Sequence, residues 1–80
     1  MSWSNIAVGK SADVKEKFTK QAAAIMFHQS AAARTIISGH VAAVIELCDN
    51  NPDFTIIAES NGHLDASGGN ADLRIRKLYG

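Results

Sequence analysis

The longest patterned stretch of the chain runs from residue 11 to residue 50, and its apolar residues recur at helical spacing. In its first half the apolar positions lie three and four residues apart, as on one face of an α-helix; they are Val14, Phe18, Ala22 and Ile25. The stretch contains no proline and a single glycine, Gly39. We therefore expect it to be helical throughout or nearly so.

The second half of this stretch has an apolar face of its own, formed by Ile37, Val41, Val44 and Cys48. The segment from His28 to Ser30 is the expected turn between two helices, and Ser30 is the expected N-cap of the second. Because the segment contains neither glycine nor proline, one continuous helix is the alternative. Gly39 indicates either close approach of another backbone or a glycine that the helix tolerates.

The first helix is expected to begin at Ser11, two residues after Gly9, which ends the preceding extended segment. The Ser11 hydroxyl would cap a free backbone N–H of the first turn. Asp13 places negative charge where the helix dipole favours it.

Two segments after Pro52 have the composition of β-strands. Residues 54–60 are rich in β-forming side chains, and residues 71–79 alternate between apolar and charged positions. The glycine-containing stretch 61–70 must turn the chain between them, and a short N-terminal strand or extended arm is expected over residues 2–9. The predicted architecture is α+β: a single domain, 1–80, with helix over 11–50 and an antiparallel β-hairpin over 53–79.

The size of the chain favours self-association. Eighty residues bury a marginal core, and a lone cysteine, Cys48, excludes a disulfide within one chain. The apolar helix surface is also broader than one partner helix requires. We therefore expect a homo-oligomer, with candidate interface residues Trp3, Phe27, Ile37 and Val41, of which Trp3 can instead cap the core and Ile37 and Val41 can belong to it.

The charge balance argues against a dedicated nucleic-acid binder, because Lys+Arg and Asp+Glu are 8 each. No apolar run approaches the ~20 residues needed to span a membrane, and the N-terminus has no basic segment followed by a long apolar one. These features predict a protein of the cytoplasm without a membrane partner.

The residues that carry catalytic or metal chemistry are sparse. His28, His40 and His63 do not have the spacing of a metal site, and His40 is expected to be a satisfied core or interface residue. No sequence motif brings a nucleophile together with a base and an acid. We expect no enzyme activity, no metal and no cofactor.

The strongest candidate for binding is the glycine-rich stretch with the basic strand after it. Glycines let backbone N–H groups approach an anion, and two arginines on one strand face can grip phosphate or carboxylate. A solvated hairpin tip and a charged edge strand are the plainer interpretation. The candidate ligand residues are His63, Ser67, Gly68, Gly69, Asn70, Arg74 and Arg76, with Arg34 on the second helix as a further candidate.

The plan of the chain resembles that of small accessory proteins of bacterial viruses. The resemblance rests on the opening Met1-Ser2-Trp3, on the run from Gly9 to Val14, and on the Gly62-His63 step. It implies a phage protein acting in the cytoplasm of a bacterial host, where some such proteins are oligomers that sequester nucleotide signals of bacterial immunity. No site residue is implied, because no family motif is matched residue by residue.

The sequence therefore predicts a non-enzymatic homo-oligomer with an anti-defence role, sequestering a small anionic ligand such as a cyclic nucleotide at subunit interfaces. The alternative is a protein-binding accessory factor that inhibits a host protein or aids assembly. A small DNA-binding protein using the basic strand is the third possibility.

Overall fold

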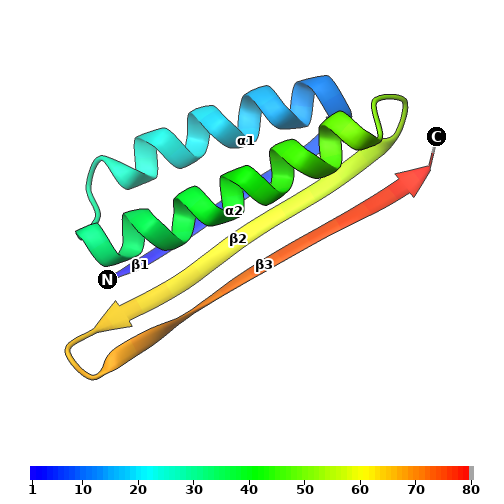
Figure 1. The fold of residues 1–80 in the computed structure, drawn as a ribbon. Helices are drawn as coiled ribbons and strands as arrows, with labels where there is room; N and C mark the ends of the chain where they lie inside the picture. The colour runs from blue at the N-terminus through cyan, green and yellow to red at the C-terminus, as the bar shows by residue number, and fades with distance from the viewer. Residues whose placement is uncertain (80) are drawn as a thin grey trace.

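The chain folds into a three-stranded antiparallel sheet with two helices packed on one of its faces (Figure 1). The computed structural model describes residues 1–79. The element order is β1 (Ser2–Lys10), α1 (Ser11–Met26), α2 (Ala31–Asn50), β2 (Thr55–Asp65) and β3 (Gly68–Tyr79). The α+β architecture predicted from the sequence is confirmed, and so is the division of residues 11–50 into two helices.

The N-terminal segment is a full strand of the sheet. It pairs antiparallel with β2 along its entire length, from Ser2 opposite His63 to Lys10 opposite Thr55. The helical hairpin carries the chain back so that β2 lies between β1 and β3. The sheet therefore has two edges, β1 and β3, which are far apart in the sequence.

The hairpin between β2 and β3 is tighter than the sequence predicts. The strands continue to Asp65 and resume at Gly68, so only Ala66 and Ser67 connect them. The expectation of a long turn over residues 61–70 is therefore wrong. Gly68 has a φ of 120°, which only glycine adopts readily, and it permits this short connection.

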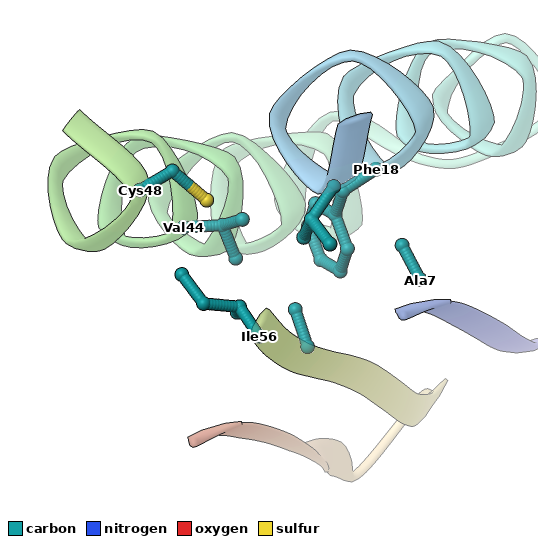
Figure 2. Packing of buried hydrophobic residues seen from close by; sticks show 7 residues of the cluster. Ala7, Phe18, Val44, Cys48 and Ile56 are labelled. Carbon is teal, nitrogen blue, oxygen red and sulfur yellow. The ribbon is translucent and has the colours of Figure 1, made fainter. Parts of the chain in front are cut away.

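The core fills the layer between helices and sheet. The predicted helix faces are confirmed: Val14, Phe18 and Ala22 of α1 have no exposed surface, and the α2 residues Ile37, Val44 and Cys48 are buried. Figure 2 shows Phe18, Val44 and Cys48 directed toward Ala7 and Ile56 of the sheet. A second cluster at the other end joins Trp3, Ala22, Ala33 and Ile37.

The two serines expected to cap helices act differently. Ser30 confirms its prediction, because its Oγ accepts from the N–H of Ala33 at 3.2 Å. Ser11 does not cap α1. Its hydroxyl donates to the carbonyl of Asn51, and its N–H donates to the carbonyl of Phe54 at 3.1 Å. Ser11 thus ties the start of α1 to the connection between α2 and β2.

Two residues predicted as interface anchors lie inside the chain's own core. Trp3 is 6% exposed and Ile37 is 1% exposed, so neither offers a side-chain surface to a partner. Val41 is half-buried between the two core clusters. Phe27 is the exception, because 82% of it is exposed at the end of α1.

The second helix is 20 residues long, and an 18-residue window of it has a mean hydropathy of 1.3, which is enough to cross a membrane by length and composition alone. The core helix of a globular protein passes the same test, and α2 includes Arg34, His40 and Glu46, so it holds no continuous apolar run of that length. In the structure, α2 packs its buried face on the sheet.

Candidate functional site

The face of the sheet opposite the helices is the candidate functional surface, and we call it the open face. Side chains alternate along each strand, so every second residue points away from the helices. The paired positions run in rows across the three strands. The rows are Val8–Ile57–Arg76, Ile6–Glu59–Arg74, Ser4–Asn61–Asp72 and Ser2–His63–Asn70.

Arg74 and Arg76 lie in adjacent rows of the open face, as the alternation of the sequence predicts. The Arg74 guanidinium is already engaged, because its Nε donates to Asp72 Oδ2 at 2.9 Å. Among residues 1–79, Arg76 has no ion pair within 4.0 Å. Arg76 is therefore the more available cation of the two.

These two arginines border a hollow of about 500 Å³ whose other lining residues are Ile57 and Glu59. The Glu59 carboxylate accepts from Asn61 Nδ2 at 3.2 Å and adds negative charge at the same place. The hollow combines two guanidinium groups, one carboxylate and an apolar side chain. Such a surface suits a ligand that has anionic groups and an apolar body.

The hairpin tip does not join the arginines. Arg74 lies six positions after Gly68, which is about 20 Å along a strand at about 3.3 Å per residue. Gly68 and Gly69 therefore lie at the far end of the hairpin. His63 and Asn70 do share the open face, as cross-strand partners in the row nearest the tip.

The polar groups of the tip are used within the tip itself. Asp65 Oδ1 accepts from the Ser67 N–H at 3.0 Å and from the Ser67 hydroxyl at 2.8 Å. These two hydrogen bonds lower the pKa of the Asp65 carboxyl below its usual range. An ionised Asp65 at this position would repel an anion, which argues against phosphate binding at the tip.

Arg34 lies on the first turn of α2, in the helical layer and not on the open face. The structure thus brings together Arg74 and Arg76 from the predicted ligand set. It separates them from Ser67, Gly68 and Gly69 and from Arg34.

A second hollow lies between the helices and is larger, at about 650 Å³. Its charged rim residues pair with one another: Lys15 with Asp49 at 2.8 Å and Lys20 with Glu16 at 2.9 Å. With its charges already balanced, this groove offers a ligand mainly apolar contact. We therefore favour the smaller hollow on the open face.

The sequence did not reveal a chain of buried polar groups between α2 and the sheet. Trp3 Nε1 donates to Ser60 Oγ at 3.3 Å, and Ser60 Oγ lies 2.6 Å from His40 Nδ1. Burial lowers the pKa of His40, and the nearby Asp72 carboxylate opposes this shift. Ser60 is 1% exposed, so its hydroxyl is not accessible to a substrate. The sequence held one signal for this contact: the alternation of each strand places Trp3 and Ser60 on the inward face.

Two further kinds of reactive group are the cysteine thiol and the residues that can bind a metal. Burial raises the pKa of the Cys48 thiol, which makes it a poor nucleophile, as expected for a structural cysteine. No cluster of three or more possible metal ligands occurs within residues 1–79.

Comparisons with protein-family models, curated proteins and solved structures found no match.

Proposed function

We propose that the protein is a non-enzymatic homo-oligomeric binding protein that holds a small anionic ligand on the open face of its sheet. The observation that supports this most directly is the pair Arg74 and Arg76, side by side at a hollow with an apolar wall. All four lining residues come from one chain, so each subunit offers a complete site.

The class of ligand follows from the chemistry of the hollow. Guanidinium groups bind phosphate and carboxylate by paired hydrogen bonds, and Ile57 offers apolar contact. A nucleotide has both an anionic and a flat apolar part. The resemblance in plan to accessory proteins of bacterial viruses makes the nucleotide signals of bacterial immunity the first ligands to test.

Calorimetric titration with a panel of cyclic mono- and dinucleotides tests this proposal. A charge-assisted hydrogen bond contributes about 1.5–3 kcal/mol, so Arg76→Ala should weaken binding about tenfold or more. Arg74→Ala should weaken it less, because Asp72 already engages that guanidinium. Glu59→Gln should strengthen binding, since it removes the carboxylate from the hollow.

Lys17→Ala is the matched control, because it removes an exposed positive charge from α1 and leaves the open face intact. If Arg76→Ala stays folded by circular dichroism and binds as tightly as the parent, the site lies elsewhere. Arg34→Ala then tests the remaining predicted cation.

A protein-binding accessory factor is the second candidate, and a different observation favours it. Ile6 and Val8 are 50% and 48% exposed on the open face, next to the half-buried Ile57. Exposed apolar side chains gathered on one face are typical of protein interfaces. If no nucleotide binds and the parent protein remains folded, this candidate takes precedence.

A further inference from the structure

We propose that two copies of this chain join edge to edge through β1, forming one continuous six-stranded antiparallel sheet. This inference rests on the homo-oligomeric part of the proposed function and specifies its geometry. It is independent of whether the open face binds an anion.

The hydrogen-bond pattern shows which backbone groups of β1 are available. Met1 exchanges a backbone hydrogen bond with Leu64, whose N–H donates to the Met1 carbonyl at 2.7 Å. In an antiparallel pair the residues alternate, so Trp3, Asn5 and Ala7 also direct their backbone groups toward β2. The N–H and C=O groups of Ser2, Ser4, Ile6 and Val8 therefore point out of the sheet at its edge.

The β1 edge lacks the features that protect edge strands. Natural proteins guard such edges with charged side chains, proline, bulges or short strands. β1 spans nine residues, has no charged side chain between Ser2 and Val8, and pairs with β2 without any shift in register. Its exposed side chains include Ile6 and Val8.

The opposite edge, β3, has features that discourage pairing with another strand. It has charged side chains at Asp72, Arg74, Arg76 and Lys77, and its pairing with β2 is irregular at Thr55–Ile56. Charged side chains and irregular pairing are among the devices that deter an edge strand from pairing with another chain. The asymmetry between the edges selects β1 as the edge that accepts another strand.

A second copy of the same strand is the partner that fits. An antiparallel strand pair is self-complementary under a two-fold axis, so identical edges satisfy each other's donors and acceptors. The register that pairs all of residues 2–10 places Ile6 opposite Ile6 of the second copy. Ser4 then lies opposite Val8 of the second copy, and no like charges meet along the strand.

The joined sheet carries the helices of both copies on one side and a continuous open face on the other. α1 packs over β1, and α2 packs over β2 and β3, so the two α1 helices flank the two-fold axis. The Arg74 and Arg76 pairs lie on the outer strands of the joined sheet, away from the junction. The proposed ligand sites thus remain open in the dimer.

The sharpest test uses proline at the edge. Ile6→Pro removes an N–H that makes no hydrogen bond within the subunit but does bond to the second copy. Ala71→Pro is the matched control, because the Ala71 N–H likewise points outward, from the β3 edge. Sedimentation at micromolar concentration should show a dimer for the parent and for Ala71→Pro, and a monomer for Ile6→Pro. Circular dichroism checks that each variant is folded.

Two further variants keep the test decisive if proline disturbs the strand. Ile6→Lys places two ammonium groups face to face on the two-fold axis and should also give a monomer. Ile57→Lys changes the open face on the central strand and should leave the dimer intact. A parent dimer that survives Ile6→Lys, or that Ile57→Lys dissociates, overturns edge pairing in favour of another interface.

The outcome for assembly is separate from the outcome for the ligand. A monomeric parent at micromolar concentration overturns edge pairing and the homo-oligomeric part of the proposed function together. Nucleotide titrations of the same parent then report on Arg74 and Arg76 alone. A dimer that binds no nucleotide retains edge pairing and rejects the ligand proposal.

Discussion

His40 on α2 and Ser60 on β2 are linked by a hydrogen bond of 2.6 Å between Nδ1 and Oγ. Trp3 Nε1 can only donate, so Ser60 Oγ accepts from it and keeps one lone pair and its own hydrogen for His40. The tautomer of His40 decides which of the two groups donates. The ring is half-buried, and burial disfavours its charged form.

This relationship predicts a pH dependence of stability. Because the pKa of His40 is lowered in the folded protein, the unfolded chain binds the proton first as the pH falls. The stability that neutral His40 contributes is complete above the unfolded pKa of about 6.5 and is lost as the pH falls through the folded pKa. We expect the melting temperature to drop between pH 7 and pH 5.

His40→Gln separates this effect from the other titrating groups. The variant cannot gain a proton at this position, so its melting temperature should change less over the same pH range. His28→Gln is the matched control, because it alters an exposed histidine that forms no ion pair within residues 1–79. Equal slopes for the parent and His40→Gln would rule out His40 as the source.

Alanine substitutions at Gly39 and Gly62 should change the stability of the protein in opposite directions. A Cβ at Gly39 would meet nothing within 4 Å, so Gly39→Ala should stabilise α2 by about 0.5–1 kcal/mol. A Cβ at Gly62 would lie 2.5 Å from the Trp3 ring, so Gly62→Ala should destabilise the protein. Urea unfolding of both variants measures the two effects. A destabilised Gly39→Ala variant would indicate that another backbone covers Gly39 in the assembled protein.

The two isoleucines Ile37 and Ile57 distinguish the core from the open face. Ile37 is 1% exposed in the core, so Ile37→Ala should cost about 2–5 kcal/mol of unfolding free energy. Ile57 is half-buried on the open face, so Ile57→Ala should cost less. Thermal unfolding compares them, and a smaller loss at Ile37 would contradict the observed packing.

The helices were largely determined by local sequence. Val14, Phe18 and Ala22 recur at the period of the helix, so the buried face could be predicted without knowing its partner. The Ser30 cap and the turn before it also depend only on neighbouring residues. For the same reason the alternation of Leu73, Arg74, Ile75 and Arg76 correctly placed both arginines on one strand face.

The tertiary structure decided which distant segments meet. Pairing of β1 with β2 joins residues about fifty positions apart, and no local pattern specifies such a partner. That pairing holds Gly62 in strand conformation beneath Trp3, where glycine alone would suggest a loop. A contact between distant segments also determines the role of Ser11. It donates hydrogen bonds to the carbonyls of Asn51 and Phe54 and does not cap its own helix. Hydrogen bonding and packing between distant segments outweighed local preference at each of these positions.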